Sequence, residues 1–420
     1  MDKKIIEHVN KEVEEMLERE KKSFSNKINK CFDDSIKELK EKLDNPNSSL
    51  NKLIQDLEIK FNVNEKENDD NLRKQIIDVD HMQNPPLINL LFIKDTNPLV
   101  NIVLYCLSNI KTLIRYYFNP KKEEKILYKV RTDPINCYLG PSFLELLDNL
   151  WKGKKKEYCP EKIHQTLKKL MRDDYATKDP SVIINYILTK LNEELKDNNK
   201  IDDNKDLDDP YDVFNEQKVH DDYWKRFNKE RTKIKVSFYS TIKQTVRCME
   251  CKNNPCFLYE TSPILNIYLN QENAEDLNFE DFKSHLIEKD KEMIDEQCMI
   301  CLGGELKLKI VNKNIKYTPE VLIININRKN DPNCKISFKY PEQFDIQKII
   351  NQEMEISDYH LTTVIKKDNN NNFIAFFKSC INEQWYSYNN TNIELVNNYK
   401  NYIFDDKKAC ILIYIGKKNI

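Results

Sequence analysis

The sequence predicts an α+β fold, in which a helical first half precedes a strand-rich second half. Between about Leu87 and Leu195, apolar residues recur every three or four positions, which is typical of amphipathic helices. After Trp224, short runs rich in β-branched and aromatic residues replace this pattern. Helices followed by strands along the chain, rather than alternating with them, indicate the α+β class.

The clearest helical signal is the stretch from Asp95 to Asn109. Thr96 and Asn97 are suited to capping the first turn, and Pro98 is suited to the first helical position because proline has no N–H to leave unpaired. One apolar face follows, made of Leu99, Ile102, Val103, Cys106 and Leu107. Further helices are expected over Pro141–Trp151, Cys159–Leu170 and Pro180–Leu195. Taken alone, the helix in Asp95–Asn109 is a core element with no catalytic feature.

Strands are expected throughout the second half of the chain. The runs are 233–248, 264–269, 305–311, 320–328, 360–367, 372–379, 383–389 and 410–415.

Two charged segments flank the helical half. Residues 1–82 are expected to form a helical extension, either a partner-binding coiled coil or helices packed on the main domain, with a polar linker over Asn62–Asn71. Residues 196–222 are acidic and predict a solvated, disordered insertion.

Composition excludes several classes of function. The 420 residues include 67 basic and 69 acidic side chains, and a net charge of -2 gives no general affinity for nucleic acid or anionic membranes. We find no apolar run near the roughly 18 residues that span a bilayer, and no secretory signal. Only five glycines occur and none precedes Gly140, which argues against a phosphate-binding loop in the first third. With 12 scattered cysteines, we expect reduced thiols and a cytoplasmic or nuclear location.

Two Cys-x-x-Cys pairs predict a metal site. Cys248 with Cys251, and Cys298 with Cys301, place two thiolates each on short turns next to predicted strands, as in a zinc ribbon. Two unrelated pairs remain the alternative. Four thiolates close the coordination of a tetrahedral ion, so the predicted zinc is structural and not catalytic.

These features together resemble the ubiquitin-specific protease family of papain-like cysteine deubiquitinases. The stretch Thr318–Arg328 is similar to the family's strand "lP..LiihlkRf", Tyr359–Lys367 to "Y.L.avi.H", and Ala409–Lys418 to the closing "AYlLfY.r". In the helical half, Leu104–Phe118 resembles "LqcLsntp.lr.yf", and the segment before Leu195 resembles the "QQDAqEFl" box, of which only Asp179 is kept.

The resemblance implies a papain-like fold with a helical thumb, zinc-ribbon fingers and a β-rich palm. The expected bounds are 1–82 for the extension and 83–420 for the protease-like domain. Within that domain we expect the thumb at about 87–230, the fingers at about 231–317 and the palm at about 318–418.

The same resemblance implies that the catalytic residues are absent. The position of the nucleophilic cysteine falls on Pro98, that of the general-base histidine on Asn372, and that of its orienting Asp or Asn on Asn389, or on Asn390 if the register slips. The oxyanion-stabilising asparagine corresponds to Ile93, and the preceding Gly-Asn-Thr turn reads Asp95-Thr96-Asn97. Proline has no nucleophilic atom and an amide accepts no proton near neutral pH.

The sequence therefore predicts a pseudo-deubiquitinase, with no catalytic residues, that serves as a binding or scaffold subunit of a larger assembly. Its expected partners are ubiquitin or a ubiquitin-like protein, and other subunits bound through the N-terminal helices; nucleic acid and membranes are not expected. Two alternatives stay open, a residual thiol hydrolase and an unrelated zinc-ribbon protein. Cys106 is expected in the core, and His164 is expected to be a surface or core residue without a catalytic role. His360 is expected to be a packed or edge residue of its strand.

Overall fold

The computed structural model describes residues 87–119, 138–196, 213–248, 255–269, 294–297, 306–327, 338–404 and 408–418, apart from 92, 154, 351, 369, 371 and 391. All of them belong to one of the two units into which the chain divides, Ile77–Ile420. The predicted extension at 1–82 lies outside the described residues. Within the described part of the chain, no helix combines the length and the apolarity needed to cross a bilayer.

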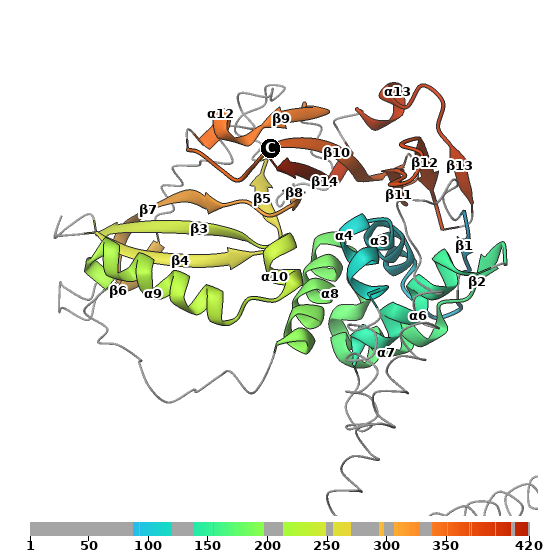
Figure 1. Cartoon of the computed structure of the whole chain (residues 1–420), viewed down its shortest axis with the longest axis horizontal. Helices are drawn as coiled ribbons and strands as arrows, with labels where there is room; N and C mark the ends of the chain where they lie inside the picture. Colours follow the sequence, from blue (N-terminus) through green and yellow to red (C-terminus); the bar gives the residue numbers. More distant parts are fainter. Residues whose placement is uncertain are drawn as a thin grey trace, which may run out of the picture. The chain divides into compact units, whose positions relative to one another are not determined.

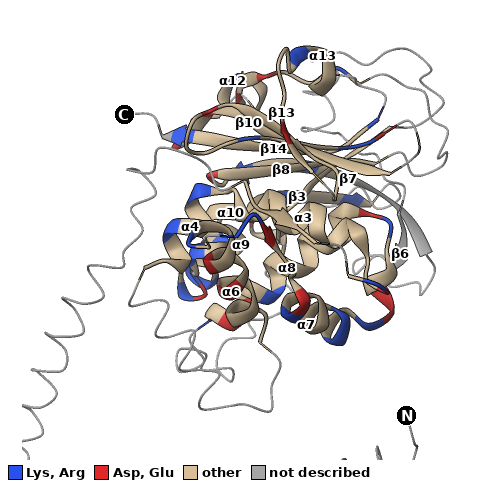
Figure 2. Ribbon diagram, turned by 90° about the vertical axis from the view of Figure 1, so that its right-hand side faces the viewer, with Lys and Arg blue, Asp and Glu red and all other residues tan. Residues whose placement is uncertain are grey.

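The described residues from 87 to 195 are mostly helical, as predicted (Figure 1). Its main elements are α3 (Pro98–Ser108), α4 (Lys111–Tyr117), α6 (Leu139–Trp151), α7 (Glu161–Met171), the 3-10 helix η2 (Arg172–Ala176) and α8 (Pro180–Leu195). A short parallel pair, β1 (Asn89–Leu90) with β2 (Glu157–Tyr158), links the segment before α3 to the segment between α6 and α7. The charged side chains of α6 are acidic, whereas those of α7 are of both signs (Figure 2).

Two predicted segments differ from the structure. The run 233–248 begins with a helix, α10 (Lys233–Phe238), whose cap Thr232 accepts a bond from the Lys235 N–H at 2.9 Å, and only then becomes β3 (Ser240–Cys248). The end of the predicted disordered insertion 196–222 is also helical, because α9 spans Glu216–Lys229. Tyr223 of α9 stacks on Tyr259 with ring centroids 4.9 Å apart, so packing on the neighbouring sheet stabilises a polar helix.

The larger sheet contains the described strands of the range 318–418, where the palm is expected, together with one strand, β5, from the range expected for the fingers. Its strand order is β13-β12-β11-β10-β14-β8-β5, with β9 beside β10, and every pairing except that of β5 with β8 is antiparallel. The bounds are β5 (Leu265–Tyr268), β8 (Val321–Asn327), β9 (Gln343–Asp345), β10 (Ile356–Lys367), β11 (Phe373–Lys378), β12 (Trp385–Tyr388), β13 (Ile393–Leu395) and β14 (Ala409–Lys418).

Both faces of this sheet are buried. Residues such as Ile365, Phe377 and Ile413 share one apolar core with the helices of the first half. On the opposite face, Val364 and Leu412 belong to a second core that includes residues of α12 (Ile346–Ile350) and α13 (Lys400–Ile403). The first core fixes the helical layer against the sheet, and α3 packs against β11. The two layers thereby bring together the N-terminus of α3 and the turns at one end of the sheet.

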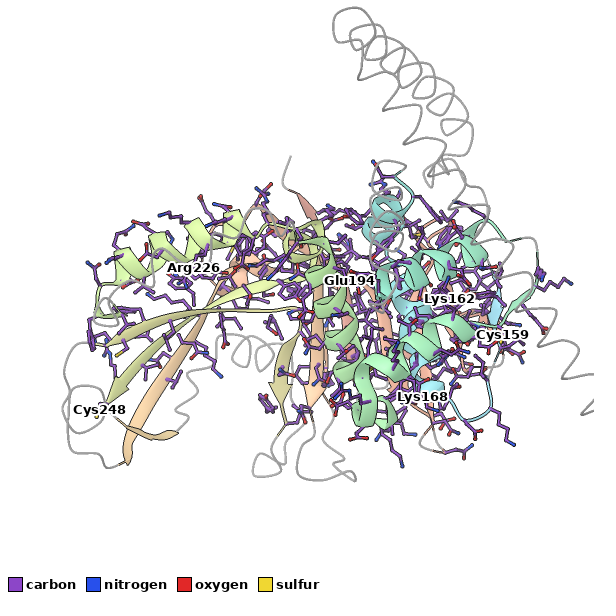
Figure 3. All side chains as sticks on the ribbon, turned by 90° about the horizontal axis from the view of Figure 1, so that it is seen from below. Cys159, Lys162, Lys168, Glu194, Arg226 and Cys248 are labelled. Atoms are coloured by element: carbon purple, nitrogen blue, oxygen red, sulfur yellow. The ribbon has the colours of Figure 1, made fainter. Side chains whose placement is uncertain are left out.

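The smaller sheet corresponds to the predicted fingers. It has the order β4-β3-β7-β6, all antiparallel, with β4 (Cys256–Ser262), β6 (Ile294–Gln297) and β7 (Leu306–Tyr317) beside β3. Figure 3 shows Cys248 at the end of this sheet remote from the helical layer.

Candidate functional site

The start of α3 has the geometry that its sequence predicts. Asn97 is the N-cap, and its Oδ1 accepts a hydrogen bond from the Leu99 N–H at 3.0 Å, while Pro98 takes the first helical position. Just before it, Asp95 has φ 64°, the left-handed conformation that non-glycine residues seldom adopt and that Asp tolerates better than most. The turn is thus formed without the glycine that the family resemblance leads one to expect at this position.

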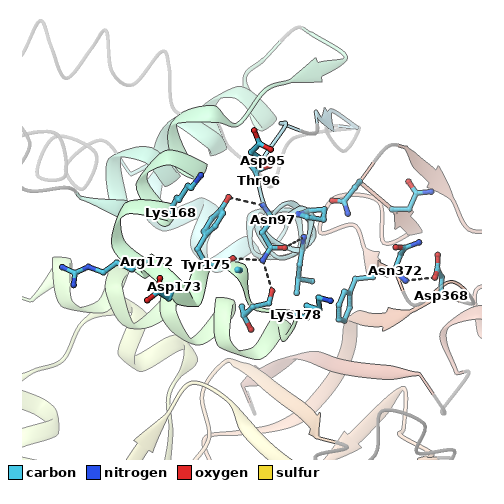
Figure 4. A pocket seen from close by; sticks show the side chains of 17 residues that line it. Asp95, Thr96, Asn97, Lys168, Arg172, Asp173, Tyr175, Lys178, Asp368 and Asn372 are labelled. Atoms are coloured by element: carbon cyan, nitrogen blue, oxygen red, sulfur yellow. Dashed lines mark hydrogen bonds between the residues drawn. The ribbon is translucent and has the colours of Figure 1, made fainter.

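A cleft of about 1000 Å³ lies beside this turn (Figure 4). Pro98, Asn372 and Asn389 all line it, so the structure brings together the positions that the resemblance assigns to the nucleophile, the base and its orienting residue. Ile93 does not line the cleft, although its carbonyl accepts a 2.6 Å bond from the Thr96 hydroxyl. Among the described residues that line the cleft, none is a cysteine or a histidine.

The palm side of the cleft consists of two exposed turns. The Asp368 carboxylate accepts hydrogen bonds from the backbone N–H groups of Asn370 and Asn372 at 2.7 and 2.8 Å, which fixes the turn between β10 and β11. The Asn372 side chain is exposed. Beyond β12, Asn389 Oδ1 accepts from the Asn392 N–H at 3.0 Å, and Asn390 has φ 71°.

The thumb side is held by a buried polar network that begins at Asn97. Its Nδ2 donates to the carbonyls of Tyr175 and Thr177, both at 2.8 Å (Figure 4). The Tyr175 hydroxyl lies 2.5 Å from His164 Nδ1, and His164 Nε2 lies 2.7 Å from Asn101 Oδ1. Because Asn101 Oδ1 only accepts, Nε2 carries the proton and the tyrosine hydroxyl donates to Nδ1. A neutral His164 therefore connects the start of α3 to α7.

Burial determines the charge state of this histidine. The side chain of His164 is 2% exposed, and desolvation lowers its pKa to about 4. The sequence left His164 open between the surface and the core, and the structure places it in the core. Its partners Asn101 and Tyr175 were not predicted, because no local pattern in the sequence connects them.

The described cysteines of the helical layer lie away from the cleft lining. Cys106 is fully buried, as predicted, and burial raises the pKa of its thiol well above the usual range, which suppresses the thiolate. Cys159 is exposed but lies at the edge of the helical layer (Figure 3). His360 Nε2 lies 2.8 Å from Asp358 Oδ2 on the same strand. His360 does not line the cleft, which agrees with its expected place as a strand residue without a catalytic role.

The smaller sheet contains the strands that flank the two predicted zinc turns. Cys248 ends β3 and pairs with Lys309 of β7, while Gln297 at the end of β6 pairs with Leu306 at the start of β7. The end of β3, the end of β6 and the start of β7 therefore lie at the same end of the sheet. Cys251, Cys298 and Cys301 lie outside the described residues.

Comparisons with known proteins agree with this architecture. The family profile described as "UCH: Ubiquitin carboxyl-terminal hydrolase" matches residues 97–414, which is more than half of the chain. A yeast SAGA DUB module with a mutant Sgf73 contains a chain of similar fold, with a TM-score of 0.53 and 14% identity over 81% of this chain and 70% of that one.

Two further SAGA DUB modules of Ubp8, Sgf11, Sus1 and Sgf73 are similar in fold. One is bound to monoubiquitin (TM-score 0.52, 14% identity, 81% of this chain and 71% of that one). The other is bound to ubiquitin aldehyde (TM-score 0.51, 14% identity, with the same 81% and 71% coverage). At this identity the likeness concerns the fold, whereas the profile match concerns the sequence itself. The chain belongs to the ubiquitin carboxyl-terminal hydrolase family.

Proposed function

We propose that this chain is a catalytically inactive member of its family, which uses the retained fold to bind a protein partner within a larger assembly. The observation that supports this is the cleft, where Pro98 and Asn372 occupy the positions expected for the nucleophile and the base. Proline offers no atom that can attack a carbonyl, and a neutral amide cannot remove a proton from a thiol. Loss of a single member of such a triad already removes most of the rate enhancement.

The alternative of a residual thiol hydrolase requires another thiolate in the cleft. Cys106 follows Pro98 on the same helix, but it is fully buried and its raised pKa keeps it protonated. The second alternative, an unrelated zinc-ribbon protein, is wrong, because the profile match shows the family.

Hydrolysis of ubiquitin that carries a C-terminal fluorophore tests the inactive state. We expect the full chain to release fluorophore at the rate of buffer alone. The variants Cys106→Ser and Cys159→Ser serve as matched controls for a displaced nucleophile. Hydrolysis by the wild-type chain that either variant abolishes would overturn the proposal and support the thiol hydrolase.

The partner is proposed from the relatives. The similar SAGA DUB modules contain ubiquitin in two cases and several further subunits. We propose that this chain binds ubiquitin or a ubiquitin-like protein with a dissociation constant in the micromolar range, and other subunits through residues 1–82. Calorimetric titration with ubiquitin tests the first part, and co-purification with the full chain against residues 83–420 tests the second. No binding of ubiquitin at hundreds of micromolar would leave only the scaffold role.

We also propose that Cys248, Cys251, Cys298 and Cys301 hold a structural zinc ion. The register that brings the end of β3 and the end of β6 to one end of the small sheet supports this, as does the chemistry of four thiolates. Elemental analysis should find about one zinc per chain. Cys248→Ser should lose the metal, whereas Cys159→Ser, a matched exposed cysteine in the helical layer, should keep it. Equal zinc in both variants would contradict the assignment.

A further inference from the structure

The strand β13 is the outermost strand of the larger sheet, and among the described residues no strand pairs with its outer edge. The N–H of Val396, directly after β13, donates to the Trp385 carbonyl at 2.8 Å, so the backbone of Val396 faces β12. Successive residues of a strand direct their backbone groups to opposite sides. The N–H and carbonyl groups of Ile393 and Leu395 therefore point away from β12, toward the open edge.

Apolar side chains lie along this edge. Leu395 is opposite Tyr386 and Ile393 is opposite Tyr388, so both share the face of the sheet that packs on the helical layer. The Tyr388 hydroxyl donates to the Leu90 carbonyl at 3.2 Å, which places β1 beside the Ile393 end of β13 (Figure 1). The strands β13 and β1 are thus neighbours at the surface.

Three leucines are exposed along these two strands. Leu395 is 49% exposed, and Leu87 and Leu91, which flank β1, are 45% and 40% exposed. We call these three side chains, together with the open backbone edge of Ile393 and Leu395, the β13 rim. An open strand edge with exposed apolar side chains is a surface that soluble proteins normally cover. A strand that pairs there needs apolar side chains on one face and polar side chains on the other.

The chain itself supplies such a segment. The described residues begin at Leu87, which belongs to the β13 rim, and a little upstream the stretch Ile77–Asp80 reads Ile-Asp-Val-Asp. This alternation has the period of a strand with one buried face. Pro85 and Pro86 separate the stretch from β1, and neither has an N–H that could continue a ladder of hydrogen bonds.

The connection is long enough for the segment to reach the rim. At about 3.3 Å per residue, the chain between Val79 and Leu87 spans up to about 26 Å, whereas a strand added to β13 lies only about 5 Å beyond it. The segment and β13 belong to the same unit of the chain, Ile77–Ile420. Because the connection returns to β1 beside the Ile393 end of β13, the segment runs antiparallel to β13.

We propose that Ile77–Val79 pairs with β13 of the same chain as an additional antiparallel strand, with Ile77 opposite Leu395 and Val79 opposite Ile393. Opposite residues share a face, so the two apolar side chains cover the β13 rim while their backbone groups face the open edge. The end of the predicted helical extension 1–82 is then a strand. The added strand closes the sheet edge to other chains. The inference does not depend on the proposed function.

Hydrogen exchange of the full chain, resolved to single amides by mass spectrometry, tests the pairing. In the wild-type chain the amides of Ile393 and Leu395 should exchange at least about tenfold more slowly than unpaired amides. Val79→Pro removes a backbone donor from the added strand and should return both amides to the unpaired rate. Gln83→Pro is the matched control, because it places proline in the connection, and it should keep the protection. The amides of β14, in the middle of the sheet, report whether each variant is folded.

A charge reversal gives a second measurement. In the proposed register Asp78 lies opposite Glu394, which is exposed, and two like charges directly opposite each other are unfavourable. Glu394→Lys makes this pair attractive and should slow exchange of the Leu395 amide by a further factor of about two to five. Glu161→Lys, which reverses an exposed charge on α7, should leave that rate unchanged.

Exchange of the Ile393 and Leu395 amides at the unpaired rate in the wild-type chain would overturn the inference. Protection that Val79→Pro keeps would also overturn it, and if that protection is lost on dilution, a second copy of the chain covers the edge instead. If Val79→Pro loses the protection of β14, the variant is unfolded and Glu394→Lys decides, with an unchanged Leu395 rate contradicting the pairing. None of these results concerns the cleft, so the proposed function is tested separately.

Discussion

The two sides of the cleft are built differently. On the thumb side, Asn97 is part of a buried network that runs through Tyr175 and His164 to Asn101. On the palm side, Asn372 and Asn389 are exposed residues on short turns. The family resemblance expects catalytic groups at three positions of the cleft. Pro98 directly follows Asn97, a member of the hydrogen-bond network, whereas the exposed side chains of Asn372 and Asn389 contribute little to the fold.

Because of this difference, we expect thumb-side substitutions to change the stability of the fold and exposed palm-side substitutions to change binding in the cleft. A substitution on the thumb side disturbs hydrogen bonds that no solvent replaces, so its cost appears in the free energy of unfolding. Substitution of an exposed side chain on the palm side, such as that of Asn372, should leave the fold intact and change only what the cleft can hold. Pro98 preserves the start of α3, so it keeps the thumb side stable. It supplies no nucleophile, so it removes the family's reaction from the cleft.

The largest effect is expected from protonation of His164. Its pKa is lowered to about 4 in the folded chain, so the unfolded chain binds the proton more tightly and stability falls as the pH falls from about 6.5 toward 4. The loss should approach about 3 kcal/mol. Urea unfolding at a series of pH values measures it, with His164→Gln as the comparison. An unchanged pH dependence in that variant would show that His164 is not the titrating group.

Asn97→Ala should follow in size. It removes the cap of α3 and leaves the partly buried carbonyls of Tyr175 and Thr177 without their donor, for a loss of about 2 kcal/mol. Asn97→Asp keeps a capping oxygen but loses the amide donor, and should therefore also destabilise. If the free energy of unfolding of Asn97→Asp equalled that of the wild type, the cap alone would matter and the network would not.

A smaller effect is expected at Asn390 on the palm side. Its φ of 71° is unfavourable for alanine, so Asn390→Ala should cost about 1 kcal/mol. Asn390→Gly relieves the backbone and removes the unpaired oxygen, so its free energy of unfolding should equal or exceed that of the wild type. Equal losses in both variants would mean that the side chain itself stabilises the fold.

Asn372→Ala should have the smallest effect. The side chain is exposed and the turn is held by its backbone N–H to Asp368, which alanine retains. The free energy of unfolding should change by less than about 0.5 kcal/mol. A loss comparable to that of Asn97→Ala would abolish the contrast between the two sides.

Local signals in the sequence predicted much of this fold. Asn97 and Pro98 marked the start of α3, and the proline at the start of α8 led to bounds that the structure reproduces, Pro180–Leu195. The segment 233–238 was wrong as a strand, because Ile234 and Phe238 are compatible with either period and only the Thr232 cap and burial of both side chains favour a helix.

The network behind the cleft could not be predicted. His164 and Asn101 lie 63 residues apart and their hydrogen bond depends on how α7 packs against α3. Likewise, the meeting of Pro98 with Asn372 and Asn389 follows from the shared core of helices and sheet, which no short motif encodes. Only the resemblance to a family predicted that these three residues correspond to one catalytic site.

The central claim is that the cleft contains no nucleophile. Incubation of the full chain with ubiquitin that carries a C-terminal electrophile, followed by intact-mass analysis, tests it directly. The account predicts that the chain keeps its unmodified mass after exposure that fully labels an active member of the family. A single ubiquitin adduct, mapped to one cysteine and prevented by substituting that cysteine with serine, would contradict it.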